Sequence, residues 1–398
     1  MNEKYQIMTK IMLIAGERSG DLLGSKIIKS FENEVKNDTV EFCGVGGNLM
    51  EKEGFKSIFD MKKISVMGLF EVLKNIFLIL SCIKQTVEFI KKEQPDIVIT
   101  IDSPDFSFRV MKAVKQFDIE NKIKKIHLIA PSVWVHRKKR AEKIAKIYDL
   151  LLCILPFEPP YFEKYGLKTI CVGHPIFDKN STEYEFNKSD FYNKYNKNSD
   201  IISITAGSRK SELNILLPVL VETINTIAQK NNNLKFHFLA TSDSKSIIDN
   251  YLKKSNCDFN YSIIDDIYEK HNSIKNSKIV IAKSGTNLLE IAGFQVPMIV
   301  IYKFNFLTNV IAKILQKLNN VKYVSLLNII NNKKTVEELL LFDCNSKNIL
   351  NIYNKIIDNQ EYLENQIEEN LSAIKQLGYK DNYSSIDKIK NEIMQFLA

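Results

Sequence analysis

Apolar and polar positions along the chain follow two different periods, one after the other. Short, nearly continuous apolar runs, such as 11–15 (IMLIA) and 96–101 (DIVITI), are separated by stretches with helical periodicity, such as 106–117 and 136–147. Nearly continuous apolar runs are typical of strands that are covered on both faces, and the intervening stretches are typical of amphipathic helices. The alternation predicts an α/β fold with parallel sheets.

The predicted strands form two series that are separated by the polar segment 187–200. The first series comprises 11–15, 40–46, 96–101, 124–130, 148–155 and 168–173. The second comprises 201–206, 234–240, 261–264, 278–282 and 297–302. We therefore expect two doubly wound, Rossmann-like domains that face each other across a cleft. The expected boundaries are an N-terminal domain 1–178, a linker 179–199, a C-terminal domain 200–345, and C-terminal helices 346–398 that pack back on an N-terminal domain.

Composition narrows the class of protein. The chain has 398 residues, of which 45% are hydrophobic, so it is long enough for two cores. Its net charge of +8 favours anionic partners, which include nucleotides, phosphorylated lipids, acidic membranes and nucleic acids. The six cysteines are scattered and form no C-x-x-C pair, which indicates reduced thiols in a cytosolic protein and predicts no metal site.

The N-terminus lacks the basic-then-apolar order of a signal peptide. The most apolar stretch of the chain is 66–83. Glu71 and Lys74 interrupt it, so its uncharged part is too short to span a bilayer. Its apolar residues are too many for one core-facing stripe, which predicts docking on a membrane surface or on acyl chains. The residues expected to make this contact are Leu69, Phe70, Leu73 and Phe77. The alternative is a helix buried on all sides.

Acidic residues lie at the carboxyl ends of the first predicted strands, where open α/β sheets bind their ligands. Asp102 ends the strand 96–101 and is either a general base or an Asx-turn acceptor that holds the loop. Asp105 is expected to cap the next helix. The turn after the strand 11–15 lacks a phosphate-binding glycine motif, so it need not bind phosphate. Glu17 lies in this turn and is a candidate to contact another part of the ligands. Asp21 is expected to cap or complement the helix that begins there.

Two turns in the second series have the pattern of a phosphate site. Gly207, Ser208 and Arg209 follow a strand and lead into a helix, so backbone amides and a guanidinium would meet an anion. Ser284, Gly285 and Thr286 repeat the arrangement after the strand 278–282. Glu290 lies one turn into the following helix, on the same face as Thr286, and could accept hydrogen bonds from a ribose. This half of the chain therefore predicts a nucleoside-diphosphate site that needs no metal.

Taken in order, these segments resemble the lipid-A-disaccharide synthase family of inverting glycosyltransferases. The segments that carry the resemblance are 15–24 (AGERSGDLLG), 44–50 (GVGGNLM), 66–73 (VMGLFEVL), 101–106 (IDSPDF), 130–144 (APSVWVHRKKRAEKI), 155–167 (LPFEPPYFEKYGL), 172–178 (VGHPIFD), 207–212 (GSRKSE), 284–290 (SGTNLLE) and 323–330 (YVSLLNII). Together they cover nearly the whole chain. The sequence departs from the family pattern at Ala206 and Leu327, which replace prolines, and at His136, which replaces a tryptophan.

The resemblance implies a GT-B fold and a reaction. The donor would be UDP-2,3-diacylglucosamine, the acceptor 2,3-diacylglucosamine 1-phosphate, and the product a β(1→6)-linked disaccharide 1-phosphate. No cofactor is implied. Matching the motifs assigns catalytic or binding importance to Glu17, Asp102, Arg209, Glu290 and Asn328. The family also implies work at the inner-membrane surface of a Gram-negative bacterium, with no nucleic acid, and leaves a homodimer open.

Two other functions are compatible with parts of the sequence. A UDP-sugar 2-epimerase could share the two-domain fold and the UDP loops, but it predicts a pocket that is closed to lipid. A non-enzymatic, basic peripheral membrane-binding protein would leave Glu17, Asp102 and Glu290 without a purpose. Release of UDP with and without the acylated sugar phosphate distinguishes all three functions.

Overall fold

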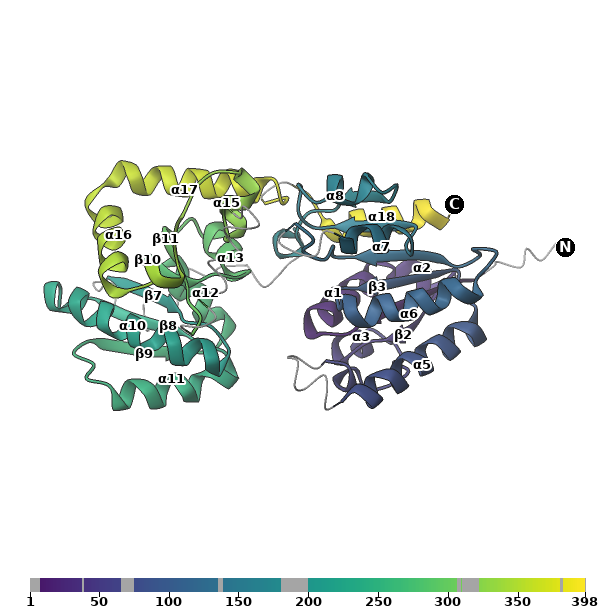
Figure 1. The fold of residues 1–398 in the computed structure, drawn as a ribbon, viewed down its shortest axis with the longest axis horizontal. Helices are drawn as coiled ribbons and strands as arrows, with labels where there is room; N and C mark the ends of the chain where they lie inside the picture. Colours follow the sequence, from purple (N-terminus) through teal and green to yellow (C-terminus); the bar gives the residue numbers. More distant parts are fainter. Residues whose placement is uncertain are drawn as a thin grey trace. The chain divides into compact units, whose positions relative to one another are not determined.

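The computed structural model describes residues 8–37, 39–65, 75–134, 139–179, 200–305, 309, 322–379 and 382–397. The chain divides into two compact units. The first contains residues 1–179 together with 382–398, and the second contains residues 180–381. Each unit is built around its own parallel sheet of six strands, as the alternating pattern predicts except for the last strand of the second sheet, 337–340, which it does not predict (Figure 1).

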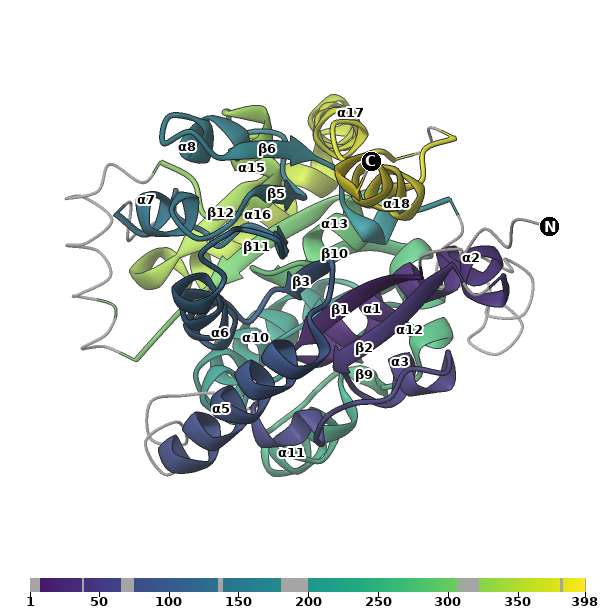
Figure 2. The same cartoon turned by 90° about the vertical axis from the view of Figure 1, so that its right-hand side faces the viewer.

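The sheet of the first unit has the strand order β2-β1-β3-β4-β5-β6 (Figure 2). Its strands are β1 (Thr9–Ala15), β2 (Val40–Val45), β3 (Ile97–Ile101), β4 (Lys124–Leu128), β5 (Leu150–Cys153) and β6 (Lys168–Cys171). Because the chain moves to one side for β2 and to the other for β3, β1 and β3 form the switch point of the sheet. Ala15 pairs with Ile101 at the carboxyl ends of these strands, so the loops that follow them are neighbours.

Helices cover both faces of this sheet. They are α1 (Arg18–Ser30), α2 (Glu32–Lys36), α3 (Asn48–Lys52), α5 (Ile76–Glu93), α6 (Pro104–Phe117), α7 (Lys139–Ala145), α8 (Pro159–Glu163) and α18 (Ser385–Leu397), with short 3-10 turns η1 (Met61–Lys63) and η2 (Pro175–Phe177). Right-handed crossovers place α5, α6, α7 and α8 on one face and α1 on the other. The contacts agree, because α5 packs against α6, α7 against α8, and α18 against α1.

Asp21 lies in the first turn of α1, where its charge complements that helix as the sequence predicts, but its side chain caps a different helix. Its buried carboxylate accepts hydrogen bonds from the backbone N–H groups of Gly47, Leu49 and Met50 at 2.9–3.0 Å. These groups belong to the first turn of α3, so Asp21 caps α3 rather than its own helix α1. A tertiary contact across 26 residues determines its role, and local sequence patterns do not reveal such a contact.

The second unit has the strand order β12-β11-β10-β7-β8-β9. Its strands are β7 (Ile201–Thr205), β8 (Lys235–Leu239), β9 (Asn260–Ile264), β10 (Ser277–Lys283), β11 (Met298–Tyr302) and β12 (Glu337–Leu340). Here the chain changes direction between β7 and β10, and Thr205 pairs with Ala282 at their carboxyl ends. Each unit thus has a switch point in its own sheet, between β1 and β3 in the first and between β7 and β10 in the second.

The helices of this unit again form two layers. They are α10 (Lys210–Lys230), α11 (Ser242–Lys254), α12 (Ile267–Lys275), α13 (Asn287–Gly293), α15 (Leu326–Asn331), α16 (Ser346–Asp358) and α17 (Gln360–Lys375), with the 3-10 turn η4 (Leu341–Asp343). The helices α10, α11 and α16 pack together, and α13, α15 and α17 form a second group.

The C-terminal helices do not form one segment. The expected segment 346–398 divides, because α16 and α17 pack on the second unit and only α18 belongs to the first. Asp178 holds the start of α18: its Oδ2 accepts hydrogen bonds from the hydroxyls of Ser384 and Ser385 and from the Ile386 N–H, each at 3.0 Å. The last helix is therefore an integral part of the first unit's core.

Candidate functional site

Glu17 and Asp102 follow the two strands that form the switch point of the first unit. Glu17 is the residue before α1, and Asp102 comes directly after β3. A Cβ atom on Gly16 would come within 2.5 Å of Ser103 Oγ, so only glycine lets the two loops pack against each other. The structure therefore brings the loops of both predicted acids together at one sheet edge.

Asp102 lies in a turn with unusual backbone geometry. Asp102 and Ser103 both have a positive φ, of 49° and 44°. Ile129, which follows the neighbouring strand β4, has a φ of 73°, and this conformation is costly for a β-branched residue. The main chain holds the turn, because the Asp102 N–H donates to the Leu128 carbonyl at 3.0 Å and its carbonyl accepts from Ser107 Oγ at 2.9 Å.

The Asx turn, one of the two interpretations of Asp102, lacks its hydrogen-bond donor. An Asx turn needs an N–H two residues after the aspartate, and that residue is Pro104, which has none. Burial raises the pKa of the Asp102 carboxyl, and a hydrogen bond from the backbone of Ser103 acts in the opposite direction. A half-buried carboxylate with a raised pKa at this edge is suited to accept a proton.

Asp105 and His174 have structural roles. Asp105 lies inside the first turn of α6 rather than at its N-cap, which is Ser103, and its carboxylate pairs with Arg140 at 2.7 Å. His174 Nδ1 accepts the Ile176 N–H at 3.2 Å. Burial lowers the pKa of His174 to about 4, so the ring is neutral at pH 7 and fixes the turn before η2.

The second unit has a pocket of about 370 Å³ at its own switch point. It is lined from the loops after β7 and β8, from α12, and from the loop and helix after β10. Six of the eight predicted donor-binding residues line it, namely Gly207, Ser208, Ser284, Gly285, Thr286 and Glu290. Asn287 joins the two sides, because its Nδ2 donates to Thr205 Oγ1 at 2.8 Å.

Positive charge surrounds this pocket. Arg209 is the N-cap residue of α10 and its side chain is 66% exposed. Lys270 and Lys283 line the pocket, and Lys283 Nζ lies 3.1 Å from Glu212 Oε1. Sequence reasoning missed both lysines. Lys283 could have been found from its position, because it is the last residue of β10 and so lies at the carboxyl edge.

Gly207 and Glu212 form a tight turn beneath these cations. Gly207 has a φ of 105°, and a Cβ atom at this position would come within 2.6 Å of Glu212 Oε2. The nearly buried Glu212 carboxylate also lies 4.0 Å from Arg209 Nη1. Glu212 therefore holds Arg209 and Lys283 on the same side of the pocket, and the glycine leaves space for this acid.

Glu290 faces the pocket from α13, with a buried histidine behind it. His271 Nε2 lies 3.9 Å from Glu290 Oε2, and the His271 ring packs against Phe294 with centroids 5.5 Å apart. His271 also lines the pocket. No periodic or motif signal marks His271 in the sequence, because its partner is 19 positions away on another element.

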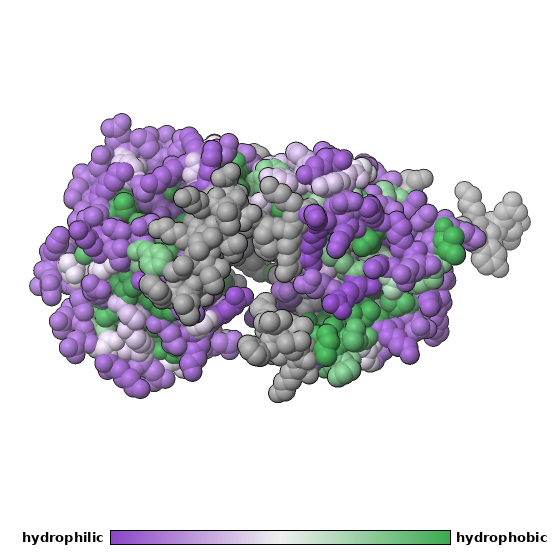
Figure 3. Space-filling view, in the orientation of Figure 1, coloured by the Kyte–Doolittle hydropathy of each residue, from purple (hydrophilic) through white to green (hydrophobic). Residues whose placement is uncertain are grey.

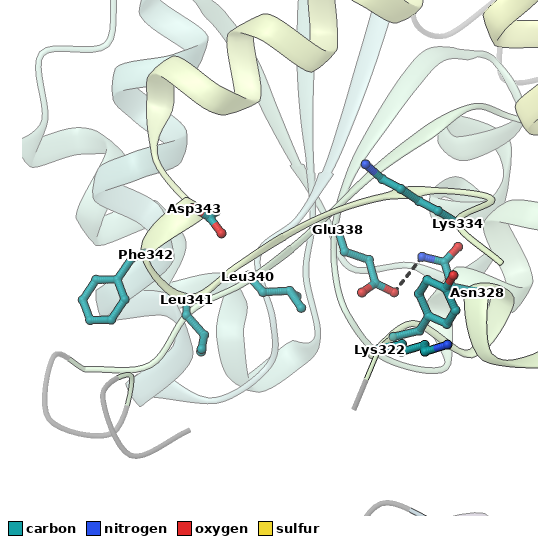
Figure 4. A pocket seen from close by; sticks show the side chains of 9 residues that line it. Lys322, Asn328, Lys334, Glu338, Leu340, Leu341, Phe342 and Asp343 are labelled. Atoms are coloured by element: carbon teal, nitrogen blue, oxygen red, sulfur yellow. Dashed lines mark hydrogen bonds between the residues drawn. The ribbon is translucent and has the colours of Figure 1, made fainter. Parts of the chain in front are cut away.

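Asn328 lies outside this pocket and is among the residues that line another, of about 250 Å³ (Figure 4). Its side chain is fully buried and its hydrogen bonds are used within its own loop. Oδ1 accepts from the N–H groups of Thr335 and Val336 and from the Thr335 hydroxyl at 2.7–2.9 Å. Nδ2 donates to the Val336 carbonyl at 3.0 Å and to Glu338 Oε1 at 2.8 Å.

The surroundings of Asn328 favour a positioning role over direct contact with a donor. Glu338 also accepts hydrogen bonds from the N–H groups of Val324 and Ser325, so Asn328 and Glu338 together tie the segment before α15 to β12. Leu327 is fully buried in the first turn of α15, a position that also suits proline. Ala206 is likewise buried, so neither replacement leaves its loop without packing.

Leu69, Phe70 and Leu73 lie outside the described residues. Phe77, in the first turn of α5, is 84% exposed. Leu78 and Leu80 in the same helix are 42% and 44% exposed. The described part of the apolar segment therefore presents large apolar side chains to solvent.

A family model and individual relatives match the chain to the same family of proteins. The family model described as lipid-A-disaccharide synthetase matches residues 11–393. A lipid-A-disaccharide synthase of Rickettsia conorii is 40% identical over 394 residues, covering 94% of this chain and 84% of that protein. One of Rickettsia felis is 38% identical over 400 residues, covering 98% of this chain and 97% of that protein.

Solved structures at low identity show the fold. A UDP-GlcNAc 2-epimerase from Neisseria meningitidis, bound to UDP-GlcNAc, has a TM-score of 0.61 at 15% identity and covers 98% of this chain and 99% of that one. A MurG from Acinetobacter baumannii has a TM-score of 0.56 at 13% identity and covers 97% and 99% of the two chains. These likenesses establish the GT-B type of fold.

Replacing Asn328 with Ala should destabilise the second unit by about 2–3 kcal/mol, because buried N–H groups of the 335–336 turn lose their acceptor. Chemical denaturation followed by circular dichroism measures the loss. Asn345→Ala, which removes an ordinary helix cap, serves as the control and should cost about 1 kcal/mol. An Asn328→Ala protein as stable as the parent, but with weaker UDP binding, would instead indicate direct donor contact.

Proposed function

The chain belongs to the lipid-A-disaccharide synthetase family and is a glycosyltransferase, and we propose that its donor is UDP-2,3-diacylglucosamine and its acceptor 2,3-diacylglucosamine 1-phosphate. The acceptor 6-hydroxyl attacks the anomeric carbon from the face opposite UDP, which gives a β(1→6) link and releases UDP. This chemistry needs a base at the hydroxyl and positive charge or dipoles at the leaving diphosphate. The observation that carries the proposal is the half-buried Asp102 at the β1–β3 switch point.

Asp102 is the general base in this proposal. Its pKa is raised by burial, and no charged group contributes to that shift among the residues that the structure describes. An aspartate with a raised pKa is a stronger base than an exposed one. Glu17, on the neighbouring loop, is the second carboxylate at this edge and would bind sugar hydroxyls or serve as the alternative base.

The second unit binds the UDP part of the donor. Backbone amides of Gly207 and Ser208, at the start of α10, meet the diphosphate together with Arg209. Lys283, the last residue of β10, adds a second positive charge beside Arg209, and Glu212 holds its ammonium group in place. Ser284, Gly285 and Thr286 contribute amides and hydroxyls from the facing loop. Glu290 accepts hydrogen bonds from the ribose, and His271 holds the Glu290 side chain in place.

The acylated substrates require access to a membrane surface, which would be the inner membrane. In the part of the chain that the structure describes, no helix is long and apolar enough to span a bilayer. The first turns of α5 form an apolar surface patch, defined here by Phe77, Leu78 and Leu80 (Figure 3). We assign membrane or acyl contact to this α5 patch, and to Leu69, Phe70 and Leu73 on the preceding segment.

Asp102→Asn should lower turnover by about 100-fold or more, because the amide cannot accept the proton, while UDP binding is retained. In the parent enzyme, kcat/KM should fall on the acid side as Asp102 is protonated, with a midpoint above the ordinary carboxyl pKa of 3.8. A steady-state assay of UDP release across pH measures both effects. Asp105→Asn, three positions further on in the first turn of α6 and exposed, is the control and should keep normal turnover. Near-normal turnover of Asp102→Asn would transfer the role of base to Glu17.

Arg209→Ala and Glu290→Gln should each raise the Kd for UDP by about 10- to 100-fold, because each removes a charge-assisted contact worth roughly 1.5–3 kcal/mol. Isothermal titration with UDP measures the constants. Lys230→Ala and Glu222→Gln change the same charges on exposed positions of α10 and should leave the Kd unaltered. Unchanged constants for the first two variants would refute the assignment of the donor pocket.

Phe77→Ser should weaken binding to phospholipid vesicles by about tenfold or more, because insertion of the exposed ring contributes roughly 1.5–3 kcal/mol. The control is Ile119→Ser. Ile119 is 82% exposed on the same unit, but it follows the carboxyl end of α6, whereas Phe77 lies in the first turn of α5. Vesicle sedimentation at several lipid concentrations gives the affinities. Equal losses in both variants, or none in Phe77→Ser, would remove the α5 patch from the membrane contact.

A further inference from the structure

A wide groove runs along the first unit between α6 and α7, outside both pockets described above. Its volume is about 1150 Å³. Thirteen residues line it, and they come from α6, from α7 and from the two positions that follow α7. The groove begins beside Pro104 and Asp105, immediately after the Asp102 turn, and continues toward the carboxyl end of α6.

The rim of the groove is strongly basic. Seven of its thirteen lining residues are lysine or arginine, and one, Asp105, is acidic. From α6 these cations are Arg109, Lys112 and Lys115, and from α7 and the turn after it they are Lys139, Arg140, Lys143 and Lys146. The local excess of six positive charges is most of the net charge of +8 that the whole chain carries. Such a concentration points to an anionic partner.

Few of these charges are neutralised within the protein. Arg140 pairs with Asp105 at 2.7 Å, and Lys146 pairs with Glu142 at 2.7 Å. Among the described residues, no acidic side chain forms an ion pair with Lys112, Lys139 or Lys143, and all three are exposed. These lysines are therefore available to an external anion.

The floor of the groove is apolar. Ile144 is fully buried, and Phe108 and Ile147 are partly buried against the core. The Arg140 guanidinium lies over the Phe108 ring at 5.0 Å from its centroid, so it covers that ring while its charge is directed to Asp105. A basic rim above an apolar floor suits an amphiphile that has an anionic head and a hydrocarbon portion.

The groove lies on the same face of the unit as the α5 patch. The helices α5, α6 and α7 cover one face of the sheet, and α5 packs directly against α6 (Figure 1). Both α5 and α6 have their first turns at the carboxyl edge of the sheet, because α5 leads into β3 and α6 follows it. The apolar surface of α5 thus neighbours the part of the basic rim that α6 contributes.

We propose that this α6–α7 groove binds the anionic headgroups of a phospholipid bilayer and thereby orients the first unit on the membrane. The inference extends the proposed function, because it names the lipid class that the membrane contact selects. Continuity with the exposed α5 patch favours a bilayer over nucleic acid, which would leave Phe77, Leu78 and Leu80 facing water. Nucleic-acid grooves also present exposed aromatic platforms, whereas Phe108 is covered by Arg140.

The test compares two triple variants that lose the same charge. Lys112→Gln, Lys139→Gln and Lys143→Gln alter the groove, and Lys230→Gln, Lys254→Gln and Lys347→Gln alter exposed positions of the second unit. Vesicles of phosphatidylglycerol and phosphatidylcholine, and vesicles of phosphatidylcholine alone, are the probes. Each membrane-facing cation contributes about a fivefold gain in affinity, so the groove variant should bind the anionic vesicles about 100-fold more weakly at low salt. Its binding to the neutral vesicles should be unchanged.

Several results would overturn the proposal. Equal losses in the two triple variants would show a general charge effect, and no loss in the groove variant would show that the groove is not used. Loss of binding to a single-stranded oligonucleotide, with vesicle binding retained, would identify a nucleic-acid groove. A raised KM for the acylated sugar 1-phosphate in uncharged detergent, again with vesicle binding retained, would identify a substrate site.

The same variants separate this inference from the proposed function. In uncharged detergent micelles the groove variant should transfer the sugar at the parent rate, because no groove residue contacts the reacting groups. If the parent enzyme itself shows no transfer with these substrates, the reaction is wrong, yet the vesicle comparison still decides whether the groove binds anionic lipid.

Discussion

The reversal of strand order within each parallel sheet is the constraint on which the site depends. Where the chain turns from one side of the sheet to the other, two adjacent strands send their following helices to opposite faces, and the loops between them stay uncovered. In the first unit this pair is β1 and β3, joined at Ala15 and Ile101. In the second it is β7 and β10, joined at Thr205 and Ala282. The predicted acids of the first unit and the predicted phosphate-binding loops of the second unit follow these pairs of strands.

The backbone around these edges is adapted to close approach. Gly16 and Gly207 each occupy a position where a Cβ atom would clash with a neighbouring polar side chain, Ser103 or Glu212. The left-handed conformations of Asp102, Ser103 and Ile129 concentrate strain at the ends of β3 and β4. Strain of this kind persists where the surrounding structure enforces it, and here buried strands on both sides provide that support. Among the residues that the structure describes, the backbone and not a charged side chain consequently holds the Asp102 carboxylate.

The sequence predicted much of the fold, because buried parallel strands carry a strong and local signal. It also singled out two loops whose residues Gly207, Ser208 and 284–286 line one pocket, since strand, small residues and helix follow one another within a few positions. It could not predict Asp21 on α3, His271 behind Glu290, or the saturated hydrogen bonds of Asn328. Each of these depends on a partner from a different element, which hydrophobic periodicity does not encode. The division of the C-terminal helices between two units has the same origin, because Asp178 recruits α18 across more than 200 residues.

The central claim is that Asp102 and the donor pocket serve transfer between two acylated sugars rather than a reaction of the UDP-sugar alone. The most direct measurement is release of UDP from UDP-2,3-diacylglucosamine by the purified chain, with and without 2,3-diacylglucosamine 1-phosphate, with the sugar products analysed by NMR. The account predicts UDP release only when both substrates are present, in equal amount to a new β(1→6)-linked disaccharide 1-phosphate. UDP release that needs no acceptor, or inversion at C2 of the donor sugar, would contradict it.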